Sequence, residues 1–114
     1  VEPHEDTNPQ MINNIKQMYI DAGNKNDALV IPVGIAFEKA YKAQKNIQLH
    51  KHYDGTHPNI LGTYLASCVV FASITHLSPL NIQYSYYDKI SKEDKEFLQN
   101  IAKETVEDFY NIDL

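Results

Sequence analysis

Three imidazoles and one carboxylate lie close together near the middle of the chain, at His50, His52, Asp54 and His57. Asp54 and His57 are separated by two residues, so a single turn of the chain would bring their side chains together. A carboxylate that accepts a hydrogen bond from one ring nitrogen fixes the tautomer of an imidazole and leaves the other nitrogen free to take a proton. This spacing suggests that His57 is a general base and that Asp54 orients it.

Two other interpretations of the same stretch compete with this one. An alternating His-x-His pattern puts His50 and His52 on one face of an extended segment, and Asp54 or His57 could complete a zinc site. Alternatively, Asp54 caps backbone amides and His57 packs against the protein, as in a non-catalytic binding domain. In each case Pro58 biases His57 toward an extended conformation and suits the first position of a following helix.

Composition limits the classes of partner. The chain has 114 residues, enough for a single domain with a core, and its net charge is −5 with histidine neutral. This charge disfavours nucleic acids and anionic membranes as partners. The single cysteine, Cys68, lies in an apolar run, which predicts a buried, inert thiol. That run is interrupted by too many small polar residues, and is too short, to cross a bilayer.

Hydrophobic periodicity predicts mostly helices. Apolar residues recur at helical spacing in four segments, which we expect to be helical: Pro9–Ala22, Ile35–Lys45, Asn59–Thr75 and Ser91–Tyr110. Ser91 and Asp94 are spaced like a capping box. The run Ala28–Val33 is short, apolar and rich in β-branched residues, which is typical of a strand buried on both faces in a parallel sheet. Residues 76–88 are predicted to form a long loop.

A single buried strand needs hydrogen-bonding neighbours on both sides, and the chain offers at most the short Ile47–Leu49 as a second strand. We therefore expect residues 1–114 to be one partial domain that pairs with further polypeptide. The same conclusion follows from the serines. None of them lies on a glycine-rich strand-to-helix turn that would expose a nucleophile, and no glycine- or asparagine-rich loop offers oxyanion donors.

The stretch Tyr53-Asp-Gly-Thr-His-Pro-Asn-Ile-Leu-Gly-Thr-Tyr-Leu-Ala66 resembles the last conserved block of the SGNH (GDSL-type) ester hydrolases. In that family an Asp-x-x-His pair followed by proline leads into the final part of the fold. The similarity extends upstream to Ile31–Glu38 and downstream through Ser78-Pro79 to the closing helix. The family's Gly-Asp-Ser block and its glycine and asparagine oxyanion blocks have no counterpart in this chain.

The resemblance implies the C-terminal part of a three-layer α/β/α sandwich, with Ala28–Val33 as a parallel strand. It implies hydrolysis of an ester, such as an acylated carbohydrate or lipid, without metal or organic cofactor. His57 would be the general base and Asp54 its orienting acid, while an upstream segment would carry the nucleophilic serine. The isolated chain would then be inactive. A secreted or periplasmic location is compatible with the resemblance, and the residues themselves do not indicate a compartment.

Overall fold

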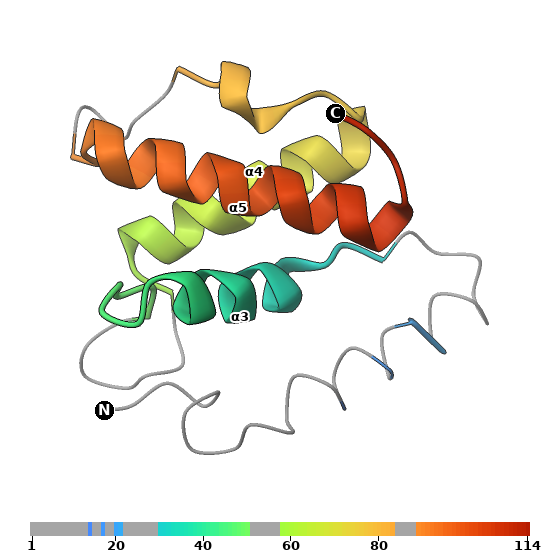
Figure 1. Cartoon of the computed structure of the whole chain (residues 1–114), viewed down its shortest axis with the longest axis horizontal. Coiled ribbons are helices and arrows are strands. Elements are labelled where there is room, and N and C mark those ends of the chain that lie inside the picture. The colour runs from blue at the N-terminus through green and yellow to red at the C-terminus, as the bar shows by residue number, and fades with distance from the viewer. Residues whose placement is uncertain (1–13, 15–16, 18–19, 22–29, 51–57, 84–88) are drawn as a thin grey trace.

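The structure is a computed structural model that describes residues 14, 17, 20–21, 30–50, 58–83 and 89–114. Three α-helices and one short 3-10 helix form this part of the chain: α3 (Val33–Ala43), α4 (Ile60–Thr75), η1 (Pro79–Asn81) and α5 (Lys92–Tyr110). Helix α5 lies across α4, while α3 lies alongside them at one edge and η1 at the other (Figure 1). The three helices that the sequence predicts in this part are therefore present, with boundaries shifted by up to two residues.

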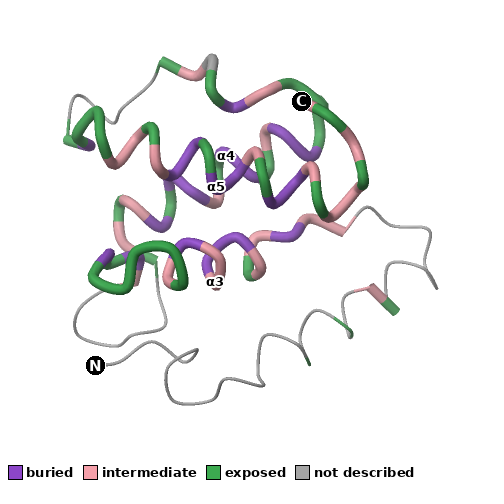
Figure 2. The backbone as a smooth tube through the Cα atoms, in the orientation of Figure 1, coloured by how far each residue is buried: buried purple, intermediate pink, exposed green. Residues whose placement is uncertain are grey.

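The core lies where the three helices face one another, and the buried stretches of the backbone turn toward this centre (Figure 2). Its members are almost all aliphatic or aromatic, with Leu65, Val69, Leu98 and Val106 fully excluded from solvent. Helix α3 contributes Ala36, Phe37 and Ala40. Burial of such side chains contributes roughly 1.5 to 3 kcal/mol each, so this contact supplies most of the stabilisation of the described part.

Helix α5 has the amphipathic pattern expected of a helix on a protein surface. The Ser91 hydroxyl caps its first turn by accepting a hydrogen bond from the Asp94 backbone N–H at 3.1 Å, as the sequence predicts. At the other end Asn111 adopts a left-handed conformation, which Asn tolerates better than most residues. On its flank, Lys39 of α3 pairs with Asp108 at 3.1 Å and Glu104 at 3.6 Å.

Helix α4 is apolar around most of its circumference and carries no charged residue. One face, which includes Tyr64, Leu65, Cys68 and Val69, is buried against α5 and α3. The opposite face is open, and Ile74 is 62% exposed. Helix α4 is therefore buried on one face only. No described helix combines the length and the apolar character needed to cross a membrane.

The predicted parallel strand is wrong, and so is the three-layer α/β/α sandwich that includes it. Among the described residues there is no β-strand, and the single pairing is an isolated bridge. Of the run Ala28–Val33, the first two residues lie outside the described part, and Val33 is already the first residue of α3. The fold of the described residues is therefore helical, with no sheet layer.

Local hydrogen bonding explains why the apolar run does not extend as a strand. The Val33 N–H donates to the Ile31 carbonyl at 2.9 Å, closing a tight turn around Pro32, whose φ of −85° and ψ of 54° suit an inverse γ-turn. The Val30 carbonyl accepts a hydrogen bond from the Tyr110 hydroxyl. Apolar, β-branched side chains thus reach the interior from a turn and a helix start, and their pattern indicated burial rather than a sheet.

The predicted helix over Pro9–Ala22 lies largely outside the described residues. Its four described positions, Asn14, Gln17, Ile20 and Asp21, are helical. The Gln17 side-chain amide donates to the Asp21 carboxylate, one helical turn further along the chain, at 2.8 Å.

Candidate functional site

The segment that enters the Asp/His stretch is fixed to helix α3 by aromatic side chains. The Tyr41 hydroxyl accepts a hydrogen bond from the Leu49 backbone N–H at 3.2 Å and lies 2.6 Å from Nδ1 of His50. The rings of Tyr41 and His50 are stacked, with an interplanar angle of 7° and centroids 5.6 Å apart. Phe37 meets the same imidazole with its edge at 5.3 Å. Leu49 itself is fully buried. The backbone just before residue 51 is therefore held by the core through the Leu49 side chain and by α3 through Tyr41 and Phe37.

The segment that leaves the stretch is fixed to the same place. His50 and Pro58 form an isolated antiparallel bridge, and the Asn59 backbone N–H donates to the Leu49 carbonyl at 2.9 Å. The Asn59 side-chain amide donates to the Gln48 carbonyl at 2.6 Å and, at a longer 3.5 Å, to the His50 carbonyl. The two ends of the seven-residue segment 51–57 are therefore joined.

Asn59 also begins helix α4. Its side-chain oxygen accepts a hydrogen bond from the Gly62 N–H at 3.0 Å, which makes it the N-cap. The expectation that Pro58 occupies the first helical position is wrong, since the helix begins at Ile60. An amide has both an acceptor and a donor, so this one side chain caps the helix and donates to the Gln48 carbonyl at once, which a proline at this position could not do.

Gly62 is required by the close approach of the two segments. A Cβ built at this position would lie 2.1 Å from the Leu49 carbonyl oxygen and 3.0 Å from Cβ of Pro58. No other residue fits without moving the backbone of Leu49. We refer to Tyr41, Leu49, His50, Asn59 and Gly62 as the anchor residues, because together they fix both ends of segment 51–57.

The predicted catalytic pair, Asp54 and His57, lies outside the described residues, as does His52. The structure therefore describes the two residues that flank segment 51–57, His50 and Pro58, and not the pair itself. His50, the one described member of the histidine cluster, contacts Tyr41 and Phe37. In the part of the chain that the structure describes, no three histidine, cysteine or acidic side chains gather as a metal site would require.

Three of the four serine hydroxyls in the described segments make local hydrogen bonds. Those of Ser78 and Ser91 cap η1 and α5, and that of Ser67 donates to the Thr63 carbonyl one turn earlier. The Ser73 hydroxyl is buried on α4 and has no hydrogen-bond partner among the described residues. No imidazole in the described part of the chain is hydrogen-bonded to any of these four hydroxyls. Ser85, the remaining serine, lies outside the described residues.

The side chain of Gln99 is buried between α4, α5 and the segment after η1. The Gln99 side-chain amide donates to the Tyr64 hydroxyl at 2.9 Å and to the Ile82 carbonyl at 2.8 Å. Burial raises the pKa of the neighbouring Cys68 thiol to about 11, and a hydrogen bond with Tyr64 offsets only part of that effect. Cys68 is buried, as the sequence predicts. Its thiol is protonated at neutral pH, which argues against a nucleophilic role.

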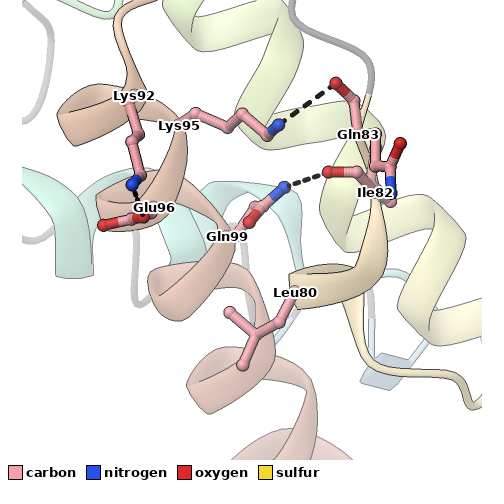
Figure 3. A pocket seen from close by; sticks show the side chains of 7 residues that line it. All are labelled: Leu80, Ile82, Gln83, Lys92, Lys95, Glu96 and Gln99. Atoms are coloured by element: carbon pink, nitrogen blue, oxygen red, sulfur yellow. Dashed lines mark hydrogen bonds and ion pairs between the residues drawn. The ribbon is translucent and has the colours of Figure 1, made fainter.

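An open depression of about 390 Å³ lies beside this group, between the segment around η1 and the first half of α5 (Figure 3). Polar side chains that line the depression already interact with other groups of the protein. Lys95 donates to the Gln83 carbonyl at 3.1 Å, Gln99 donates to Ile82, and Lys92 pairs with Glu96 at 3.9 Å. None of the anchor residues lines this depression, so it is separate from the ends of segment 51–57.

The anchor roles of Tyr41, Asn59 and Gly62 are what reasoning from the sequence missed. An asparagine directly before an apolar helical run is a local signal for an N-cap and could have been found. A glycine inside a helical pattern indicates a close approach but does not say to what.

Comparisons of the chain with protein-family models, with curated proteins and with solved structures find no match.

Proposed function

We propose that this chain supplies the acid–base half of a serine ester hydrolase of the SGNH type. His57 is the general base, Asp54 orients it, and an upstream segment contributes the serine. The proposal rests on the motif Tyr53–Ala66 and concerns the chemistry of that stretch. The α/β/α sandwich that the resemblance also implied is not part of it.

One observation supports this proposal most directly. Two residues of the motif that carry no chemistry, Asn59 and Gly62, join the segment directly after His57 to the segment before residue 51. A general base must be held within hydrogen-bond reach of the proton that it removes, and small displacements reduce the rate steeply. Fixed ends are the arrangement that such a pair needs, and a solvent-exposed linker would not need them.

The proposed roles follow from the chemistry of the two side chains. His57 removes the proton of the serine hydroxyl as that oxygen attacks the ester carbonyl. It then returns the proton to the departing alcohol, and the acyl-enzyme is hydrolysed by water activated in the same way. The Asp54 carboxylate accepts a hydrogen bond from the other ring nitrogen and stabilises the imidazolium that forms. An acylated carbohydrate is a suitable substrate class, on the resemblance alone.

Labelling with a fluorophosphonate probe, which reacts with activated serines, tests the proposal. We expect this chain alone to remain unlabelled, because it lacks the nucleophile. A longer polypeptide that includes the encoded upstream segment should be labelled on a new serine. In that polypeptide His57→Ala and Asp54→Asn should each slow labelling by about 10³-fold or more.

The matched control is His76→Asn, which removes an exposed imidazole from the C-terminal end of α4. Asn tolerates the left-handed conformation of this residue, so the variant should fold and be labelled at the wild-type rate. Equal labelling of the wild-type protein and the His57→Ala variant would contradict the proposed role of His57. Absence of labelling in the longer polypeptide would contradict the serine mechanism as a whole.

A further inference from the structure

The side-chain amide of Gln99 has an acceptor that its own hydrogen bonds do not use. Gln99 is only 3% exposed, and its nitrogen donates to the Tyr64 hydroxyl and to the Ile82 carbonyl. Both hydrogens of the amide are therefore engaged. The amide oxygen, Oε1, accepts no hydrogen bond from any residue of the described part, and in Figure 3 it points away from Ile82.

This oxygen is accessible from the depression beside η1. Among the described residues, the one fully enclosed polar side-chain atom without a partner is Oγ of Ser73, so Oε1 of Gln99 is not enclosed. Gln99 itself lines the depression. A molecule bound there would meet an acceptor held in place by two hydrogen bonds of the same amide, and it would need a donor to match it.

Two ammonium groups line the same depression, both from the first half of α5 (Figure 3). Lys95 precedes Gln99 by one helical turn and Lys92 precedes it by two. In the described part Lys95 donates one of its three hydrogens, to the Gln83 carbonyl, which leaves two. Lys92 and Glu96 are 3.9 Å apart, beyond hydrogen-bond length, and both are exposed, so this pair contributes little and can rearrange.

The size and the walls of the depression suit a small ring. Its volume of about 390 Å³ is at the lower end of the range for small-molecule sites. Leu80 and Ile82 add apolar surface to the polar lining. Lys95 and Gln99 are separated by about 5 to 6 Å along the helix surface, so a ligand that meets both carries its anionic group and its donor on different sides of the molecule.

We propose that this depression binds a monosaccharide acid. A ring hydroxyl donates to Oε1 of Gln99, and the carboxylate accepts hydrogen bonds from Lys95 and Lys92. The C–H face of the ring packs against Leu80. This site does not involve the anchor residues, and it does not depend on the proposed esterase chemistry.

An NMR titration of the isotope-labelled 114-residue chain with glucuronate tests the proposal. We expect saturable shifts of the Gln99 side-chain amide and of the backbone of residues 92–99, with a Kd on the order of 1 mM. Glucose lacks the carboxylate and cyclohexanecarboxylate lacks the hydroxyls. Each should bind at least about tenfold more weakly, because each loses one of the two kinds of hydrogen bond.

Substitutions of the charged lining residues should change the Kd in opposite directions. Lys95→Gln removes a charge-assisted hydrogen bond and should raise the Kd for glucuronate by about tenfold. Glu96→Gln removes a negative charge beside the bound carboxylate and should lower it by about twofold. Lys42→Gln is the matched control, because it makes the same charge change at an exposed lysine of α3 that does not line the depression. It should leave the Kd unchanged.

Gln99→Met tests the acceptor directly, since methionine keeps an unbranched side chain of similar length without the amide oxygen. This variant should bind glucuronate no better than the wild-type chain binds cyclohexanecarboxylate. If the loss of the amide prevents folding, the three ligands and the lysine variants still decide the question.

Three results would overturn the site. The first is the absence of saturable shifts at about ten times the expected Kd. The second is equal affinity for glucuronate and cyclohexanecarboxylate, because the hydroxyls would then not be recognised. The third is an equal loss of affinity in Lys95→Gln and Lys42→Gln, because binding would then follow the net charge of the chain and not the lining of the depression.

Discussion

The α4–α5 interface and the anchor residues hold the same chain by different means. At the interface, Leu65, Val69, Leu98 and Val106 exclude water with aliphatic side chains, and no single atom determines the contact. At the anchor residues, individual polar groups and the lack of a Cβ at Gly62 determine the contact. Asn59 makes hydrogen bonds in two directions, and Gly62 admits the Leu49 carbonyl. The interface should therefore account for stability, and the anchor for the placement of segment 51–57.

The largest effect on stability should come from the interface. Leu98 is fully buried, so Leu98→Ala leaves a cavity and should lower the free energy of unfolding by about 2 to 5 kcal/mol. Urea denaturation followed by circular dichroism measures this change. Leu77→Ala is the matched control, since Leu77 is 58% exposed and its replacement should change stability by less than about 0.5 kcal/mol. Similar losses in both variants would mean that the helices do not pack as described.

Gly62→Ala should have an intermediate effect, and its sign is informative. In an exposed helix this change would stabilise by roughly 1 kcal/mol, because alanine has the higher helix propensity. Here the new Cβ would lie 2.1 Å from the Leu49 carbonyl oxygen, so we expect a net loss of about 1 to 3 kcal/mol. Ser67→Ala, at an exposed position of the same helix, should be neutral or slightly stabilising. A stabilising Gly62→Ala would contradict the close approach of the two segments.

The smallest effect should come from Asn59, where two substitutions separate its two roles. Asn59→Ala removes both the cap and the amide donor and should lower stability by about 1 kcal/mol. Asn59→Asp keeps an acceptor for the Gly62 N–H but loses the donor to the Gln48 carbonyl, so most of the stability should remain.

Hydrogen exchange should show the loss of the side-chain amide donor, which the two variants share. The backbone N–H of residue 59, which donates to the Leu49 carbonyl, should exchange faster in both variants than in the wild-type chain. Wild-type exchange in Asn59→Asp would show that the side-chain amide does not help to join the two segments. Asn59 would then serve only as the N-cap of α4 and would have no role in placing segment 51–57.

Short-range patterns in the sequence predicted the helices well. The Ser91 and Asp94 spacing predicted the cap of α5, and the apolar periodicity predicted α4 and α5 to within one residue. For Ala28–Val33 the pattern failed, because β-branched apolar residues report burial and not the hydrogen-bonding partner. The actual partners of this run include the Tyr110 hydroxyl, some eighty residues away. The pairing of Asp54 with His57 stays a prediction.

The sequence by itself determined where α4 and α5 begin and end to within one residue, because capping and periodicity depend on residues within about four positions of one another. It also placed Asp54 and His57 three positions apart along the chain. Only the tertiary structure decided that Tyr41 supports His50 and that Gly62 faces the Leu49 carbonyl. The physical reason is that these contacts depend on how α3 and α4 pack around residues 47–50, and no local pattern encodes the distance between two separate elements.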